Sequence, residues 1–362
     1  MASDTVNIGI IGAGQISTSC CGAADKHEAA QVVAAFDPNA QRLQELCSER
    51  NIPTAYDSAE ALLADDTIDA VYVAVPNKFH APYAKQALEA GKHVILDKPF
   101  ALNLAEAEEV AALAESTGKL FMLGMNMRYR TESQQIRTLA KQGKFGEIYH
   151  VKAFWFRRTG IPKLGTWFGN KAMAGGGALL DIGVHLLDLG LHLSDLWNPV
   201  SVTGATYTKF GNRGLGEGSW GKSDREDIAF DVDDFATALI KFDTGATVTL
   251  DVSWACHAED ANRNDVHIYG TEAGAGAYPA KVFSYGANDY SIEQGEDLAG
   301  INLDLPHGNR FHNFFNAILG TEQPLTSVQE ALTVQRILDA IYESCATGRE
   351  VRLDQNPVVS AS

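Results

Sequence analysis

Short apolar runs alternate with helical patterns over the first 125 residues, and this alternation restricts the fold more than any other feature of the sequence. The runs are rich in Val, Ile, Leu and Ala, and they cover residues 6–11, 32–36, 70–75, 93–96 and 120–123. Strands that are apolar along nearly their whole length are buried on both faces, which is typical of a parallel sheet covered by helices. Because strand–helix–strand crossovers are right-handed, residues 1–125 are predicted to form a doubly wound α/β domain.

Two of the helices between these strands have clear end signals. Asn103 is predicted as an N-cap because Glu106 follows three residues later, as in a capping box, and this helix extends to Gly118. A second helical pattern covers residues 80–90 and stops at Gly91.

The pattern changes after residue 125, where longer strand candidates follow one another with few helices between them. The strand candidates cover residues 148–156, 200–210, 235–242, 247–254 and 266–269. Helical patterns cover residues 131–142, 179–193 and 328–346, and a glycine- and charge-rich surface loop covers 212–234. Residues 126–362 are therefore predicted to form a second, α+β domain with an antiparallel or mixed sheet. Two domains also suit a chain of 362 residues, which is more than one core usually organises.

Composition restricts the partners and the compartment. The net charge of −17 disfavours nucleic acids and anionic membranes, so we expect a small, neutral substrate. The five cysteines are scattered without the spacing of a disulfide framework or a zinc site, which favours a reducing cytoplasm. The N-terminus lacks the basic region of a signal peptide, and we expect no membrane-spanning segment.

A glycine turn after the first strand predicts a dinucleotide site of the Rossmann type. Gly12 would make the tight turn, and Gly14 would leave room for a pyrophosphate at a helix N-terminus. Ser17 replaces the usual third glycine, which is a mild departure because serine is small. Asp37 lies 25 residues after Gly12, at the end of the second strand, where an acid would bind the adenosine ribose. Because a carboxylate there repels a 2′-phosphate, NAD(H) is favoured over NADP(H); the alternative for Asp37 is an ordinary turn with Pro38.

Polar residues also follow the next two strands. Pro76 and Asn77 close the third strand, and Lys98 closes the fourth. The carboxyl ends of parallel strands face the ligand crevice, so Lys98 is predicted to point toward the nicotinamide; the alternative is a solvated surface lysine.

The second domain has an acid and a histidine four residues apart on a predicted helix. Asp181 and His185 would share one face, where the carboxylate could orient the imidazole for proton transfer. Two alternatives remain open, a buried structural hydrogen bond and a metal site that extends to Asp188 and His192. The metal site is the weakest because the context of a typical zinc site is missing, and no metal is predicted.

Together, four motifs resemble the glucose–fructose oxidoreductase / inositol dehydrogenase / MocA-like (Gfo/Idh/MocA) family over nearly the whole chain. They are the Gly12-Ala-Gly14 turn, Val75-Pro-Asn77-Lys-Phe-His80, Asp97-Lys98-Pro99, and the glycines 175–177 that lead to Asp181 and His185. Asp97 stands where the family usually has glutamate. The resemblance implies an open mixed sheet in the second domain, which would bind substrate and form a homodimer or homotetramer.

The resemblance also implies hydride transfer between the hydroxyl carbon of a sugar, polyol or inositol and NAD(P). Lys98, Asp181 and His185 would form the catalytic set, with His185 as base, Lys98 as donor to the same oxygen, and a cis Lys98–Pro99 bond. The predicted cofactor-binding residues are Gly12, Gly14, Gln15, Ile16, Asp37, Val75, Pro76, Asn77, His80, Asp97 and Lys98.

Weaker substrate-site candidates follow strands or lie near strand ends. They are Asn126, Arg128, Trp155, Trp167, His257 and His312, with Arg157, Arg158 and Arg310 as similar cases. Aromatic faces suit the C–H surfaces of sugars. Two other functions remain open: an NAD-dependent glycosidase or lyase that oxidises and then re-reduces its sugar, and a non-catalytic NAD(H)-sensing protein.

Overall fold

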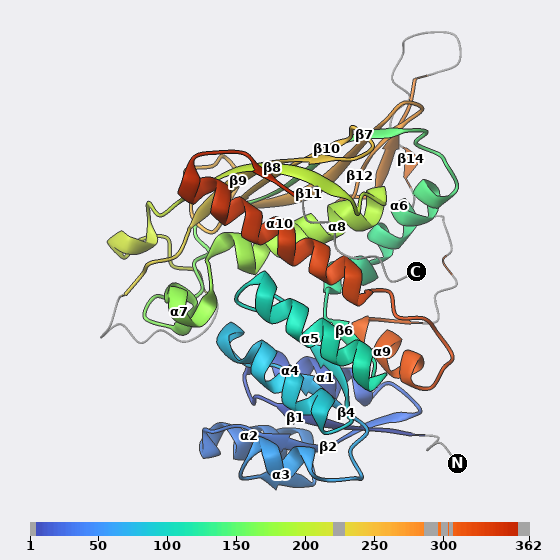
Figure 1. The fold of residues 1–362 in the computed structure, drawn as a ribbon, viewed down its shortest axis with the longest axis vertical. Helices are drawn as coiled ribbons and strands as arrows, with labels where there is room; N and C mark the ends of the chain where they lie inside the picture. Colours follow the sequence, from blue (N-terminus) through green and yellow to red (C-terminus); the bar gives the residue numbers. More distant parts are fainter. Residues whose placement is uncertain (1–4, 220–228, 286–295, 298–302, 304–306, 354–362) are drawn as a thin grey trace. The chain divides into compact units, whose positions relative to one another are not determined.

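The computed structural model describes residues 5–219, 229–285, 296–297, 303 and 307–353 (Figure 1). Its contacts divide the chain into two compact units. The first contains the described residues of Met1–Asn126 and Leu305–Leu332, and the second contains those of Met127–Asp304 and Thr333–Ser362. The chain therefore returns to the first unit near its C-terminal end, which the sequence pattern does not predict.

The first unit is built on a six-stranded sheet with the order β3-β2-β1-β4-β5-β6, in which all described pairs are parallel. Its strands are β1 (Val6–Ile11), β2 (Ala30–Phe36), β3 (Thr54–Tyr56), β4 (Ala70–Val73), β5 (His93–Leu96) and β6 (Phe121–Leu123). Its helices are α1 (Thr18–Ala24), α2 (Ala40–Arg50), α3 (Ala59–Leu63), α4 (His80–Glu89), α5 (Leu104–Thr117) and α9 (Arg310–Ile318). The doubly wound fold is confirmed, and only the edge strand β3 is missing from the predicted set. It was missed because it is three residues long and largely exposed, so it has no apolar run.

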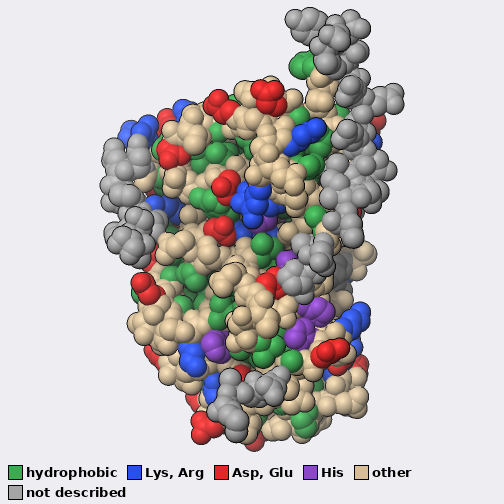
Figure 2. All heavy atoms as spheres, turned by 90° about the vertical axis from the view of Figure 1, so that its right-hand side faces the viewer, with side chains coloured by type: hydrophobic (Ala, Val, Ile, Leu, Met, Phe, Trp, Pro, Cys, Tyr) green, Lys and Arg blue, Asp and Glu red, His purple; other side chains and the backbone are tan. Residues whose placement is uncertain are grey.

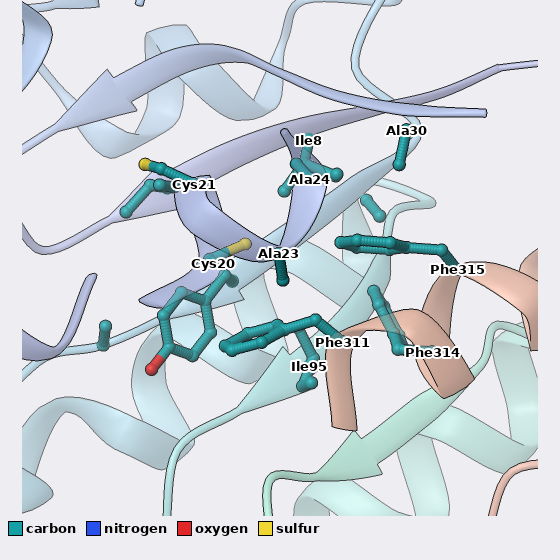
Figure 3. Packing of buried hydrophobic residues seen from close by; sticks show 14 of the residues in the cluster. Ile8, Cys20, Cys21, Ala23, Ala24, Ala30, Ile95, Phe311, Phe314 and Phe315 are labelled. Carbon is teal, nitrogen blue, oxygen red and sulfur yellow. The ribbon is translucent and has the colours of Figure 1, made fainter. Parts of the chain in front are cut away.

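Helix α9 completes the core of the first unit. Phe311, Phe314 and Phe315 are buried on one face of α9, at the spacing that places residues on the same side of a helix. They pack with Cys20 and Ala23 of α1, as Figure 3 shows. The segment that returns from the second unit is therefore part of the hydrophobic core that supports the sheet.

The second unit is built on a nine-stranded mixed sheet with the order β14-β13-β12-β11-β7-β10-β9-β8-β15. Among the described strands of this second sheet, only β7 and β10 pair in parallel; the other neighbours are antiparallel, and the prediction of an antiparallel or mixed sheet is confirmed. The strands are β7 (Ile148–Arg157), β8 (Pro199–Tyr207), β9 (Phe235–Phe242), β10 (Thr247–Ser253), β11 (Asn262–Gly270), β12 (Gly274–Gly276), β13 (Lys281–Phe283), β14 (Glu296–Asp297) and β15 (Val351–Arg352). The helices are α6 (Thr131–Lys141), α7 (Lys171–Ala174), α8 (Val184–Ser194) and α10 (Val328–Thr347), of which α10 spans the boundary between the units. Residues 220–228 of the predicted surface loop lie outside the described residues.

The apolar helix α8 covers the middle of one face of this sheet, and α10 contacts β8 on the same face. Helix α8 packs against β7 and β11, and every α8 residue except His185 is buried. The stretch Lys171–Ser194 is long and apolar enough to cross a membrane, with a mean hydropathy of 1.3 over its most apolar window. However, 72% of that window is buried inside the protein, so its apolar character is explained by its place in the core.

Charged side chains are spread over the surface. On the face drawn in Figure 2, acidic and basic side chains are interspersed. Several form exposed pairs, such as Lys85 with Glu109 and Arg137 with Asp195, each with an N···O distance of 2.7 Å. Exposed pairs contribute at most about 1 kcal/mol each, so the ion pairs that shape the fold are the buried ones described next.

Candidate functional site

The glycine turn after β1 has the geometry that a dinucleotide site requires. Gly12 has a φ of +104°, and a Cβ there would lie 2.3 Å from the carbonyl oxygen of Ala74, so only glycine fits. A Cβ on Gly14 would meet no atom within 4 Å, which leaves open space in front of the turn. Ser17 is fully buried and donates to the carbonyl oxygen of Gly14 at 2.6 Å, so a small residue suffices at the third glycine position. These residues fit a pyrophosphate approaching a helix N-terminus.

Asp37 is held against this turn. Its carboxylate accepts hydrogen bonds from the backbone N–H groups of Ala13 at 2.7 Å and Asn39 at 2.8 Å. An acid at the end of β2 is therefore fixed beside the glycine turn, where an adenosine ribose would lie. Gln15 and Ile16, in the 3-10 turn that leads into α1, are both exposed.

A buried histidine joins the turns that follow β4 and β5. The imidazole of His80 lies 2.9 Å from the carbonyl oxygen of Val75 through Nε2 and 2.6 Å from that of Pro99 through Nδ1. Burial lowers the pKa of His80 despite these two acceptors. His80 is only 1% exposed, so its imidazole links the two turns from the interior of the unit. The Lys98–Pro99 peptide is cis, as the family resemblance implies.

Asp97, which is predicted as a cofactor contact, has its carboxylate in a buried network. Oδ1 accepts from the backbone N–H of Lys98 at 2.9 Å and from Nη1 of Arg310 at 3.0 Å, and Oδ2 accepts from the hydroxyl of Tyr72 at 3.0 Å. Burial raises the pKa of Asp97, but the charges of Arg310 and Lys98 outweigh burial and hold that pKa below its usual value. Lys98 itself is half-buried at the carboxyl end of β5.

In the second unit, Asp181 and His185 lie where the helix changes its winding. Asp181 belongs to a π-helical turn, Leu179–Gly183, and His185 belongs to the first turn of α8. The carboxylate of Asp181 accepts from the indole N–H of Trp254 at 2.8 Å. Trp254 is fully buried directly after β10, and the sequence analysis missed it; its position at a strand end was the available signal. π-helical turns are frequent at functional sites.

Two weaker candidates on β7 lie on the same side of this unit as Asp181. Burial lowers the pKa of the Arg157 guanidinium, and the charge of Asp181 partly offsets this effect, so the two groups are near one another. The Arg157 guanidinium also lies over the Trp155 ring at 4.3 Å, and the Trp155 indole donates to Asn262 at 2.8 Å. Asp181, Arg157 and Trp155 therefore form a connected polar and aromatic surface within the second unit.

The start of the Asp181 helix is held by a buried carboxylate that the sequence did not indicate. Asp233 accepts from the backbone N–H groups of Gly177 at 2.8 Å and Leu179 at 2.9 Å, and from the Tyr342 hydroxyl at 2.7 Å. A Cβ on Gly177 would lie 1.8 Å from the carbonyl oxygen of Asp233. Gly177 is thus needed for the close approach of the backbone at Asp233.

Comparison with known families agrees with both halves of this description. Residues 6–125 match a family described as "Oxidoreductase family, NAD-binding Rossmann fold", and residues 133–275 match the "GFO/IDH/MocA C-terminal domain". The chain belongs to the GFO/IDH/MocA oxidoreductase family. This confirms the resemblance, the fold class and the prediction of an oxidoreductase with an NAD-binding Rossmann domain.

Relatives within the GFO/IDH/MocA family match most of the chain. The chain is 29% identical to D-glucoside 3-dehydrogenase of Escherichia coli, over 98% of this chain and 99% of the relative. It is 37% identical to a putative UDP-kanosamine synthase oxidoreductase subunit of Amycolatopsis mediterranei, over 69% of this chain and 68% of the relative. Among solved structures, an NAD-binding protein from Listeria innocua has a TM-score of 0.79 and 26% identity, and covers 99% of this chain and 100% of its own.

The remaining candidates are engaged in contacts within their own units. Arg128 is fully buried, and its guanidinium pairs with Asp188 at 2.6 Å. Asp188 was part of the possible metal stripe, so this GFO/IDH/MocA chain uses that carboxylate in an ion pair. His192 of the same stripe is also buried.

The other predicted positions belong to both units and are described within each. Asn126 is exposed at the start of a 3-10 turn after β6. Trp167 stacks on the neighbouring phenylalanine at a ring distance of 3.9 Å, and the His257 ring meets another phenylalanine edge-on at 5.3 Å. His312 lies on α9 with Nε2 at 3.0 Å from a backbone carbonyl oxygen of α1, which places it at the α1–α9 contact of the first unit.

Proposed function

We propose that the chain is an NAD-dependent dehydrogenase that oxidises a CH–OH group of a sugar or polyol. The observation that carries the proposal is the arrangement at the carboxyl edge of the first sheet, where the open glycine turn, Asp37 and Lys98 follow β1, β2 and β5. Ligands of doubly wound sheets bind at this edge. The glucoside dehydrogenase that matches 98% of this chain supports a carbohydrate substrate.

Each residue of the proposed catalytic set would have a separate role in the reaction. Bound NAD would supply the hydride acceptor. Lys98 would donate a hydrogen bond to the substrate hydroxyl oxygen and stabilise the negative charge that develops on it. His185 would accept the hydroxyl proton as general base. Asp181 would orient the base or the substrate, since its carboxylate is itself fixed by the Trp254 indole.

Replacing Lys98 with alanine tests this assignment. The Lys98→Ala enzyme should lose turnover by at least about 100-fold, which is the usual scale of a proton-transfer or charge-stabilising group. Its affinity for NAD, measured by calorimetric titration, should change little. Lys78→Ala is the matched control, because Lys78 is an exposed lysine in the turn after β4. A Lys98→Ala enzyme that works at the wild-type rate would contradict the proposal.

The preference for NAD rests on Asp37. The Asp37→Asn variant keeps an oxygen that can accept from the Ala13 N–H but removes the charge that would repel a 2′-phosphate. The repulsion between the Asp37 carboxylate and a 2′-phosphate across a short, hydrated distance is about 1 kcal/mol or more. Its removal should raise the ratio of kcat/KM for NADP over NAD by about fivefold or more. An unchanged ratio would remove Asp37 from the specificity argument.

A screen of sugars and polyols with both nicotinamide cofactors separates the remaining functions. Net formation of NADH from a free sugar is the expected result for a dehydrogenase. Product formed without net NADH would instead identify an enzyme that returns the hydride to its substrate. NAD binding without turnover of any sugar would favour the sensing protein.

We also propose that the second unit assembles as a homo-oligomer through the face of its sheet opposite α8. Leu239 of β9 and Tyr269 of β11 are exposed there, and both are large apolar side chains. The ring of Phe235 contacts those of Phe156 and Tyr207 on the same face, and a contiguous apolar patch is typical of a protein interface. The molar mass by light scattering should be a multiple of 39.0 kDa, and a mass of one chain would refute this.

A further inference from the structure

The guanidinium of Arg310 connects three neighbouring strands of the first sheet at the edge that carries Lys98. Nη1 donates to the Asp97 carboxylate at 3.0 Å and to the carbonyl oxygen of Gly124, and Nη2 donates to the Tyr72 hydroxyl at 3.2 Å. Tyr72 lies on β4, Asp97 follows β5, and Gly124 follows β6. Arg310 is the first residue of α9, so all of these contacts lie within the first unit.

This network is buried, so the charge of each ionised member depends on the presence of its partner. Arg310, Asp97 and Tyr72 are each less than a tenth exposed. A buried carboxylate without a cation is strongly disfavoured by desolvation and tends to take up a proton. Asp97 would then lose the charge that makes it a strong acceptor for the N–H of Lys98.

The contacts also require arginine in particular. Its two Nη atoms serve different acceptors, and its Cζ lies over the Phe311 ring at 4.8 Å from the ring centroid. A lysine ammonium is a single point charge that lacks the planar fork, so it would not reproduce the same set of contacts.

We propose that Arg310 is a positioning residue for Lys98. It keeps Asp97 ionised and fixed, and Asp97 in turn holds the backbone of Lys98, so that the ammonium is presented in one orientation. The inference rests on the proposed catalytic role of Lys98 only for its effect on turnover. The effect on the Lys98 side chain itself can be measured without any reaction.

The test compares Arg310→Met and Arg310→Lys with Arg42→Met, which removes an exposed arginine of α2 in the same unit. Lysines are dimethylated with a ¹³C label, and the NMR resonance of Lys98 is assigned by its absence from Lys98→Gln. Arg310→Met should shift or broaden the Lys98 resonance, Arg310→Lys should do so less, and Arg42→Met should leave it unchanged. In unlabelled enzyme, Arg310→Met should lower kcat by at least about tenfold, since misplacement of a catalytic group by about 1 Å can reduce rates by up to about 100-fold. The KM for NAD should stay within about twofold.

A merely structural ion pair would give a different pattern. The Lys98 resonance would then match that of wild type, and activity would follow only the folded fraction measured by denaturation; this outcome would overturn the proposal. If Arg310→Met does not fold, Arg310→Lys and Gly124→Ala decide, because a Cβ on Gly124 would lie 2.6 Å from Nη1 and displace the guanidinium without removing its charge. If Lys98→Ala proves active while the resonance still responds to Arg310, the catalytic role of Lys98 fails and the positioning by Arg310 stands.

Discussion

Replacing Gly177 with alanine tests how the second unit holds Asp181 in place. The new Cβ would lie 1.8 Å from the carbonyl oxygen of Asp233, whereas real Cβ contacts are essentially never shorter than 3.0 Å. The two segments must therefore separate by about 1 Å or more. Such a shift would break the hydrogen bonds from Gly177, Ala178 and Leu179 to Asp233, which are 2.8–2.9 Å long.

The expected destabilisation follows from these three bonds. The bond from Ala178 to a backbone carbonyl is worth about 1 kcal/mol, and each of the two bonds to the carboxylate about 1.5 kcal/mol or more. Alanine also lowers the conformational entropy of the unfolded chain, which offsets up to about 1 kcal/mol of this destabilisation. We therefore expect Gly177→Ala to lower the free energy of unfolding by about 3 kcal/mol.

Urea denaturation followed by tryptophan fluorescence reports on the second unit, because the four tryptophans that the structure describes all belong to it. With a denaturant dependence of about 2–3 kcal/mol per molar, the midpoint should fall by about 1 M. In the folded variant kcat should also fall, while NAD affinity should be kept. Gly22→Ala in α1 is the control, since its Cβ would meet no atom within 4 Å. A midpoint within about 0.2 M of wild type for Gly177→Ala would refute the steric reasoning.

Two further predictions concern buried polar groups of the second unit. Trp254→Phe removes the donor to the Asp181 carboxylate. Because a hydrogen bond to a charged group is worth about 1.5–3 kcal/mol, kcat/KM should fall by about tenfold or more. An unchanged rate and pH profile would show that the indole does not orient Asp181. Burial, and secondarily the charge of Arg128, hold the pKa of His192 well below its ordinary value of 6.5. A group whose pKa is lowered by folding stabilises the protein above its unfolded pKa, so stability should be full above pH 6.5 and decrease as the pH falls below it. Denaturation midpoints at pH 7 and pH 5 should differ less in His192→Gln than in wild type. An equal difference in both proteins would show that His192 does not cause the loss of stability at low pH.

The sequence was sufficient wherever the physical signal was local. Strands β1, β2, β4, β5 and β6 have apolar runs, and the Asn103 cap was visible three residues from its partner, with Asn103 accepting from the N–H of Glu106 at 3.0 Å. The spacing of Asp181 and His185 also placed both at the start of one helical segment, although it did not reveal the π-helical turn. The dinucleotide turn was found because its glycines, strand and acid lie within one short segment.

The supporting residues could not be predicted because their partners are remote in sequence. Arg310 pairs with a carboxylate 213 residues earlier, and Trp254 donates to one 73 residues earlier. The Tyr342 hydroxyl reaches Asp233 across 109 residues. Composition and periodicity describe one segment at a time, so they do not indicate which buried charge meets which partner. For the same reason, the sequence did not indicate that Arg310 faces Asp97, whose contact with the cofactor stays a prediction.

The return of residues 305–332 to the first unit has a consequence for biosynthesis and for protein engineering. The ribosome synthesises the six strands of the Rossmann sheet long before α9. The apolar side of α1 therefore lacks its contacts with Phe311, Phe314 and Phe315 until most of the second unit has been translated. A fragment cut after residue 126 would lack these aromatic rings and the guanidinium behind Lys98. A chimera that exchanges the cofactor half between relatives therefore has to transplant two pieces of the gene.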